Sequence, residues 1–174
     1  MMSNHHAPRG ESTLMPAPSP IRLFRFGMQR LQHICNRLWR PLTLGVRALV
    51  IDAEGRVFLV RHSYIAGWHL PGGGVEPGET ARTGLERELE EEGNILITNE
   101  PTLLGVYFNN YASERDHVLI YVVRDFRQTA PRTADWEIVE TGFFAPNALP
   151  DGVARATRER IAEALNGTPK TDHW

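Results

Sequence analysis

The feature that most constrains this chain is the stretch Gly73–Ile95, in which a glycine-rich turn leads into a segment crowded with acidic residues. Residues three and four apart share one face of an α-helix, so Glu88, Glu91 and Glu92 are expected to form one acidic patch. Like charges at that spacing destabilise a helix unless a cation neutralises them. Mg²⁺ prefers oxygen ligands and keeps several waters and substrate phosphates in its shell. The stretch therefore predicts a Mg²⁺ site that handles phosphates.

A simpler interpretation of the Glu90–Glu92 run is a solvated helix face, which is what most glutamate runs are. The order of residues over the whole stretch favours the metal site, because it resembles the Nudix box. In that family pattern a glycine is followed after five residues by a glutamate, and after seven more by Arg-Glu-aliphatic-x-Glu-Glu-x-Gly-aliphatic. The matching positions are Gly73, Glu79, Arg87, Glu88, Leu89, Glu91, Glu92 and Ile95.

One position departs from the pattern, and one glycine inside the predicted helix is unusual. The family's second glycine falls on Asn94, with Gly93 one place early. A residue that ends a helix commonly needs a positive φ, and asparagine is the usual substitute for glycine there, so we expect Asn94 to do the same job. Gly84 is unfavourable in a helix by roughly 1 kcal/mol relative to alanine. A close approach of backbone or ligand would explain it, and so would drift.

The resemblance to the Nudix family implies both a fold and an activity. The fold is α/β, a Nudix-type α/β/α sandwich with a mixed β-sheet. The activity is Mg²⁺-dependent hydrolysis of a pyrophosphate bond in a nucleoside diphosphate linked to another moiety, with Mn²⁺ as a possible substitute for Mg²⁺. Water attacks one phosphorus of the P–O–P bridge, and catalysis of this kind consists mostly of positioning and neutralisation of charge.

The same resemblance assigns roles within the box. The implied metal ligands are the Gly73 carbonyl, Glu88, Glu91 and Glu92. Glu88 is a ligand or a base according to the enzyme. Arg87 is expected to orient a glutamate rather than to touch the metal, and Glu79 is expected to be structural or a weak outer ligand.

The general base is expected from outside the box. In several family members a glutamate before a late strand adds a ligand or activates the water, and Glu137, six residues ahead of Phe143, loosely matches that arrangement. Glu140, Glu114 and Asp116 compete for the role. Glu137 could also be an ordinary acid at the start of a strand.

Substrate identity depends on side chains that stack on or hydrogen-bond to the base and sugar. The candidates are Arg61, Trp68, His69, Tyr107 and Tyr111. Each of them could equally be a packing or an exposed residue. Tyr111 falls sixteen residues beyond Ile95, where some dinucleoside-polyphosphate hydrolases carry a tyrosine. No signature for coenzyme A or ADP-ribose is found.

The pattern of apolar residues predicts the remaining elements. Strands are expected at Leu44–Ile51 and Arg56–His62, joined as a hairpin through Asp52–Gly55. The acidic helix should span Ala81–Gly93, with Thr80 as its N-cap. Further expected elements are strands at Thr102–Asn109, His117–Phe126 and Glu137–Ala145, a loop at Arg127–Asp135, and a closing helix at Gly152–Asn166 capped by Asp151. This order is typical of a mixed sheet between helices.

The chain is expected to form one catalytic domain with extensions at both ends. Residues 1–20 are polar and proline-rich without periodicity, which predicts a disordered tail. Residues 21–41 show apolar residues at helical spacing and predict an amphipathic helix. Residues 42–167 form the Nudix hydrolase domain, and residues 168–174 a C-terminal tail.

The N-terminal helix is rich in arginine, and the chain has no acidic residue between Glu11 and Asp52. We favour packing of this helix against its own domain or a partner subunit, with the arginine stems covering apolar surface. Contact of residues 21–40 with an anionic membrane surface is the alternative. Acid-poor, arginine-rich N-termini also resemble organelle transit peptides.

Composition limits the classes of function. The 174 residues carry a net charge of −2, which argues against a protein that coats nucleic acid. A single cysteine, Cys35, rules out an internal disulfide and a cysteine-based zinc site. No apolar run is long enough to span a membrane and no signal peptide is found, so a soluble, cytoplasmic protein is predicted.

The predicted partner is a nucleotide-type small-molecule substrate, without stable nucleic-acid binding. A homodimer is left open. Because the box carries all its catalytic residues, a nucleotide pyrophosphohydrolase is the predicted function. The alternative is a non-catalytic Nudix-fold module that binds or senses a nucleotide without cleaving it.

Overall fold

The structure is a computed structural model that describes residues 42–174. The predicted tail at residues 1–20 and helix at residues 21–41 lie outside the described residues. The elements are β1 (Thr43–Val50), β2 (Val57–His62), β3 (Trp68–His69), α2 (Ala81–Gly93), β4 (Ile95–Ile97), β5 (Thr102–Phe108), β6 (Asp116–Val123), β7 (Phe126–Gln128), β8 (Ile138–Phe144) and α3 (Arg155–Leu165).

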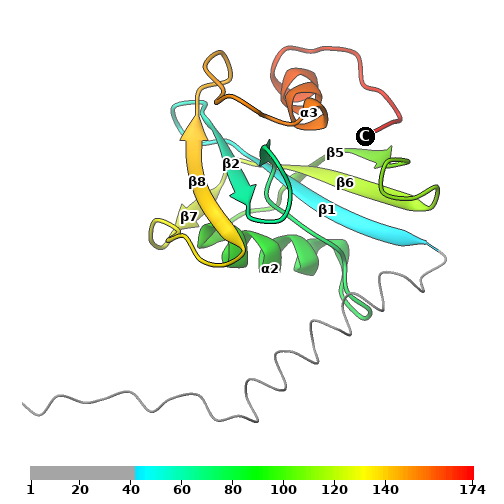
Figure 1. Cartoon of the computed structure of the whole chain (residues 1–174), viewed down its shortest axis with the longest axis horizontal. Coiled ribbons are helices and arrows are strands. Elements are labelled where there is room, and N and C mark those ends of the chain that lie inside the picture. Colours follow the sequence, from blue (N-terminus) through cyan, green and yellow to red (C-terminus); the bar gives the residue numbers. More distant parts are fainter. Residues whose placement is uncertain (1–41) are drawn as a thin grey trace, which may run out of the picture. The chain divides into compact units, whose positions relative to one another are not determined.

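The strands form three small sheets between two helices. In the first, β6 lies between β1, to which it is parallel, and β5, to which it is antiparallel. The second has the order β3-β2-β8, with antiparallel pairs throughout, and the third is the antiparallel pair β4-β7. Figure 1 shows α2 on one side of these strands and α3 on the other. The predicted α/β sandwich with mixed strand directions is confirmed.

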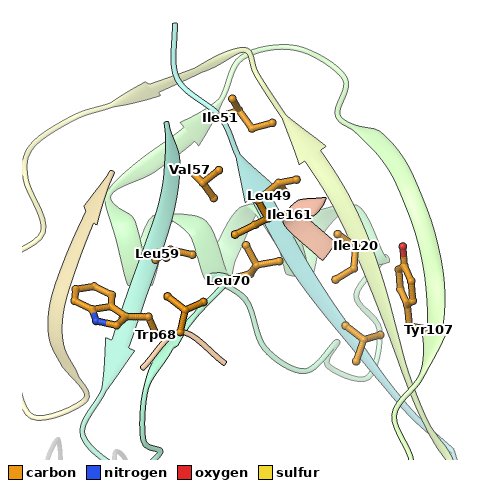
Figure 2. Packing of buried hydrophobic residues seen from close by; sticks show 11 residues of the cluster. Leu49, Ile51, Val57, Leu59, Trp68, Leu70, Tyr107, Ile120 and Ile161 are labelled. Atoms are coloured by element: carbon orange, nitrogen blue, oxygen red, sulfur yellow. The ribbon is translucent and has the colours of Figure 1, made fainter. Parts of the chain in front are cut away.

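Alternate residues of β1 and β2 pack on opposite faces, which explains why both strands are almost continuously apolar. On one face Val46, Ala48 and Val50 pack in a cluster with Leu85 and Leu89 of α2. On the other face the core contains Leu49, Ile51, Val57, Leu59 and Ile161 of α3, as Figure 2 shows. Each leucine or isoleucine side chain stabilises the fold by roughly 1.5–3 kcal/mol when it is fully buried. The helix that carries the acidic residues is therefore fixed by its apolar stripe.

The predicted hairpin between β1 and β2 is wrong as a paired hairpin, although its turn forms. The Asp52 N–H donates to the Arg56 carbonyl at 3.0 Å, and the Asp52 carboxylate accepts the Arg56 N–H at 2.7 Å. Pairing of the two strands then stops at a single bridge between Ile51 and Val57. Beyond it the edge of β1 is occupied by the glycine-rich segment, whose Pro71 carbonyl accepts the Ala48 N–H at 2.9 Å.

Two other boundaries differ from the prediction. The closing helix begins at Arg155, and its N-cap is Ala154 without a side-chain cap, so Asp151 does not cap it. The preceding residues instead bond to β3, because the Trp68 N–H donates to the Gly152 carbonyl at 3.1 Å and the Ala154 N–H donates to the Trp68 carbonyl at 3.0 Å. The segment predicted as a loop at Arg127–Asp135 begins with the end of β7, which pairs with β4.

The last residues of the chain lie along the end of β5. The Phe108 N–H donates to the Asp172 carbonyl at 2.7 Å, and the Trp174 N–H donates to the Phe108 carbonyl at 2.9 Å. The fully buried Arg160 of α3 holds this segment and donates to the Glu163 carboxylate at 2.8 Å.

Among residues 42–174, no helix is long and apolar enough to cross a membrane.

The buried pair of Arg160 and Glu163 generates a prediction about stability. Arg160→Leu leaves the Glu163 carboxylate buried without its cation, so we expect the free energy of unfolding to fall by roughly 3–5 kcal/mol. Urea denaturation followed by circular dichroism measures it. Replacement of both residues by leucine should recover most of the loss, because no unpaired charge then remains. A single variant within about 1 kcal/mol of the wild type, on the scale of an exposed ion pair, would contradict the assignment.

Candidate active site

Both ends of α2 are fixed by the residues that the sequence predicts. The Thr80 hydroxyl accepts the Thr83 N–H at 3.0 Å and caps the first turn. Asn94 ends the helix with φ 52° and ψ 35°, in the left-handed region, and its N–H donates to the Glu90 carbonyl at 3.1 Å. The expectation that Asn94 replaces the family's glycine at this position is confirmed.

The glycine-rich segment runs along β1 and lies against α2. The Val46 N–H donates to the Gly73 carbonyl at 2.9 Å, and the Val75 N–H donates to the Leu44 carbonyl at 2.8 Å. A Cβ on Gly72, whose φ is +135°, would lie 2.1 Å from the Val46 carbonyl oxygen. A Cβ on Gly73 would lie 2.3 Å from the Glu88 Oε1. Position 72 therefore requires glycine, because a side chain there would meet the backbone of β1, whereas a side chain at position 73 would displace the Glu88 carboxylate.

Glu92 is the most buried of the acidic residues on α2. Its Oε2 accepts the Gly72 N–H at 2.8 Å, and its Oε1 lies 3.5 Å from His62 Nε2. Burial raises the pKa of Glu92 to about 8, and burial likewise lowers the pKa of His62 to about 4. At neutral pH the proton therefore resides on Glu92 and the imidazole is neutral, so the 3.5 Å contact is not an ion pair. Neither ring nitrogen of His62 has a hydrogen-bond partner among the described residues.

Glu88 and Glu91 both contact Arg87, but their side chains lie in different environments. The Glu88 carboxylate accepts from Arg87 Nη1 at 2.8 Å and is mostly buried. Burial raises the pKa of Glu88, and the positive charge of Arg87 opposes that shift. The Glu91 side chain is 62% exposed and lies 3.3 Å from Arg87 Nη1. Glu91 is thus free to change rotamer, whereas Glu88 is held.

Arg87 ties the helix to the glycine-rich segment. Its Nε donates to Glu79 at 2.8 Å and its Nη2 donates to the Gly74 carbonyl at 3.0 Å. The hydrogen bond from Arg87 lowers the pKa of Glu79, which also accepts the Glu76 N–H at 2.9 Å. A Cβ on Gly84 would lie 3.2 Å from Glu79 Oε2. The nearest neighbour of that position is therefore the side chain of the glutamate that holds Arg87, and neither a ligand nor the backbone.

The three predicted carboxylate ligands do not gather into one compact group. Within the described part of the chain, no set of three or more histidine, cysteine, aspartate or glutamate side chains is arranged to hold a metal ion. The donor chemistry nevertheless fits a hard divalent cation, because the carboxylates of the mostly buried Glu88 and the buried Glu92 flank the backbone of Gly72 and Gly73. Glu91 would have to rotate toward them.

The segment before β8 brings Glu137 to the same site. Asp135 Oδ1 accepts the N–H groups of Glu137 and Ile138, each at 2.8 Å, and the Ser63 N–H donates to the Glu137 carbonyl at 2.9 Å. The negative charge of Glu137 contributes to the raised pKa of Glu92, so the two carboxylates are electrostatic neighbours.

The three competing acids have other surroundings. Glu140 pairs with Arg61 at 2.6 Å, and Asp116 accepts from Asn109 at 2.7 Å. Glu114 is exposed on the segment between β5 and β6.

The predicted substrate-contacting residues lie in different environments. Trp68 belongs to the core and its ring lies 4.9 Å from that of Phe144, while the Arg61 guanidinium lies 5.7 Å from the Trp68 ring centroid. His69 Nε2 lies 2.9 Å from the Ala66 carbonyl, and its ring centroid is 6.3 Å from that of His62.

The two tyrosines lie elsewhere. Tyr107 is buried and donates to Glu163 at 2.8 Å. Tyr111 is highly exposed between β5 and β6.

Sequence reasoning missed His62, Tyr64 and Arg47 as members of this site. Arg47 donates to the Leu70 carbonyl at 2.9 Å, and its positive charge acts against the burial that raises the pKa of Glu92 and Glu88. None of the three belongs to the recognised motif. They reach the site because β1 bonds to the glycine-rich segment and the end of β2 pairs with β3, from which that segment continues. Only the strand pairing reveals this arrangement.

Comparison with known proteins gives a consistent result. The profile of the NUDIX domain matches residues 41–165. A protein of Bacillus subtilis named putative 8-oxo-dGTP diphosphatase is 28% identical over 127 residues, covering 72% of this chain and 81% of that protein. An ADP-ribose pyrophosphatase of Methanocaldococcus jannaschii is 32% identical over 105 residues, covering 58% of this chain and 61% of that protein. The crystal structure of a MutT NUDIX hydrolase from Burkholderia pseudomallei matches with a TM-score of 0.63 at 26% identity, over 72% of this chain and 100% of that chain.

The pKa shifts of Glu92 and His62 generate a prediction about pH in the presence of a chelator. Between about pH 6.5 and 8 folded Glu92 keeps a proton that unfolded Glu92 has lost, so the free energy of unfolding should fall as pH rises, by at most about 1.4 kcal/mol per pH unit. Between about pH 4.5 and 6.5 this slope is opposed by His62, which is neutral when folded and protonated when unfolded.

Urea denaturation at several pH values would measure this dependence. Glu92→Gln should flatten the slope above pH 6.5 while keeping an acceptor for the Gly72 N–H. The same slope in the wild type and the variant would show that Glu92 is not the group responsible.

Proposed function

This chain belongs to the NUDIX family and is a hydrolase of phosphorus-containing anhydrides, and we propose that it cleaves the pyrophosphate bond of a nucleoside diphosphate linked to another moiety, with Mg²⁺. The observation that carries the proposal is the pair of carboxylates, mostly buried Glu88 and buried Glu92, that lie against the glycine-rich segment. Burying two acids side by side is unfavourable. A cation that binds them there would offset that cost.

Glu88, Glu91, Glu92 and the carbonyl of Gly73 would hold the metal. Bound there, the ion would neutralise charge on the phosphate oxygens and lower the pKa of a water molecule. The Gly73 carbonyl already accepts one hydrogen bond from Val46 and has a second lone pair for a metal. The exposure of Glu91 supports its role as the ligand that completes the shell by rotation.

Neighbouring residues would position these groups. Arg87 holds Glu88 through a hydrogen bond and is itself held by Glu79, so its role is orientation rather than contact with the metal. The Gly72 N–H fixes one oxygen of Glu92. Arg47, whose positive charge acts against the raised pKa of Glu92, would add positive charge where the phosphates bind.

Glu137 is our candidate for the general base. It acts electrostatically on Glu92 from across the site, and its backbone is fastened by Asp135 and Ser63. A base must lie within hydrogen-bond reach of the attacking water. A water held between the carboxylates of Glu137 and Glu92 would meet that requirement.

The substrate class follows from what the relatives' names share. The Bacillus protein is named for 8-oxo-dGTP and the Methanocaldococcus protein for ADP-ribose, which share a nucleoside joined to a pyrophosphate. For this chain we propose that Arg61 and His69 contact the substrate and that buried Trp68 supports Arg61. Tyr111 would contact only a substrate long enough to reach the segment between β5 and β6.

The alternative is a module that binds a nucleotide without cleaving it. The observation that favours it is that no set of three or more histidine, cysteine, aspartate or glutamate side chains among residues 42–174 is arranged to hold a metal ion. Mg²⁺-independent binding of nucleotides without turnover would decide for this alternative.

The activity is tested by a screen of nucleoside diphosphate derivatives with Mg²⁺ or Mn²⁺, with chromatography of the released nucleotides. We expect Glu92→Gln to lower kcat by roughly 10²–10⁴-fold, as removal of a key charged group does. Glu90→Gln is the matched control, because Glu90 is exposed on the same helix and should tolerate the change. Full activity of Glu92→Gln, or of the wild type in excess chelator, would refute the proposal.

A second prediction concerns the base. Glu137→Gln should lower kcat by roughly 10²–10⁴-fold and remove the acidic limb of the pH–rate profile, with little change in KM. Glu100→Gln, which removes an exposed acid that pairs with Arg82 rather than with the residues of the site, serves as the control. An unchanged acidic limb in Glu137→Gln would assign the base to another residue.

A further inference from the structure

An aromatic ring that the recognised motif does not include lies beside the carboxylate site. Tyr64 follows the end of β2 and is 67% exposed. Its ring centroid is 5.0 Å from that of His62, whose Nε2 lies 3.5 Å from Glu92 Oε1. One imidazole therefore separates the exposed tyrosine ring from the most buried carboxylate of the site.

The segment that carries Tyr64 is held in place. The Ser63 N–H donates to the Glu137 carbonyl at 2.9 Å, and the Ser63 hydroxyl donates to the Trp136 carbonyl at 2.7 Å. These bonds join the segment after β2 to the segment before β8. An exposed aromatic ring on a fastened backbone is a surface prepared for contact, since little conformational entropy remains to be lost on binding.

The surroundings of Tyr64 favour a flat, neutral ligand. Two other large apolar residues on the same two segments are exposed, Ile65 by 47% and Trp136 by 61%. Partial burial of the phenol raises the pKa of Tyr64, so the ring stays uncharged at neutral pH.

We propose that Tyr64 is the residue on which the nucleobase of the substrate stacks, with Ile65 and Trp136 bordering that position. The inference rests on the proposed function, because it takes the diphosphate to lie against Glu88 and Glu92. Stacking is tolerant of base identity, since every base presents a π-face. The enzyme should therefore bind purine and pyrimidine nucleotides with affinities that differ only modestly.

The test is calorimetric binding of AMP and UMP, in Mg²⁺, to the full chain and its variants. Tyr64→Ala and Tyr64→Leu should raise the Kd for both nucleotides by roughly ten-fold or more, because loss of base–aromatic stacking has effects of that size. Tyr64→Phe, which keeps the ring, should stay within about two-fold of the wild type. Leu103→Ala, which removes a side chain that is 47% exposed on β5, is the matched control for loss of exposed apolar surface.

Turnover provides a second measurement. For a nucleotide substrate Tyr64→Ala should raise KM and leave kcat within a few-fold, while KM for a base-free ribose diphosphate ester should not change. Tyr64→Ala or Tyr64→Leu that binds AMP as the wild type does would overturn the inference, and so would a wild type that binds neither nucleotide. If the wild type binds both nucleotides through Tyr64 but hydrolyses nothing, the inference stands and the proposed function fails.

Discussion

The rest of the structure depends on how the glycine-rich segment pairs with β1. Hydrogen bonds from Val46 and Ala48 to Gly73 and Pro71 place this segment on the edge of the strand that β2 would otherwise occupy. Since the same segment has no Cβ atoms at positions 72 and 73, α2 can approach until Glu88 and Glu92 touch its backbone. One set of backbone hydrogen bonds thus separates two strands and creates the floor of the site.

Two effects reduce the electrostatic repulsion among the acidic side chains of α2. Arg87 neutralises part of the charge of Glu79, Glu88 and Glu91, and Glu92 keeps a proton at neutral pH. Metal binding by Glu92 would have to release that proton, which couples affinity to pH. The arginine and the proton together let a cluster of acids exist in the folded chain without a metal.

Sequence patterns predict the structure correctly where interactions between residues close in the sequence determine it. The bounds of α2, the cap at Thr80 and the left-handed Asn94 follow from helix periodicity and capping chemistry. The pairing of β1 with β2 and the start of α3 were predicted wrongly. The backbone there is instead hydrogen-bonded to partners distant in sequence, the glycine-rich segment and Trp68.

The same limit applies to the site. Motif spacing predicted the carboxylates but not Arg47, His62 or Tyr64, which reach the site only through strand pairing. Spacing also predicted that Glu88, Glu91 and Glu92 form a single patch, whereas Glu92 is buried and Glu91 is exposed. Which rotamer an acid adopts depends on what surrounds the helix, and sequence periodicity does not contain that information.

The C-terminal segment also has a consequence for how the protein can be handled. Its backbone satisfies the N–H and C=O groups of Phe108 at the end of β5, and it lies over the buried Arg160. A chain shortened before Thr171 would open that strand edge to neighbouring molecules, which promotes edge-to-edge aggregation. It would also remove two acceptors of the Arg160 guanidinium, the His173 carbonyl and the Thr171 hydroxyl, and leave only Glu163. A purification tag at this end therefore needs a linker that leaves the final residues in place.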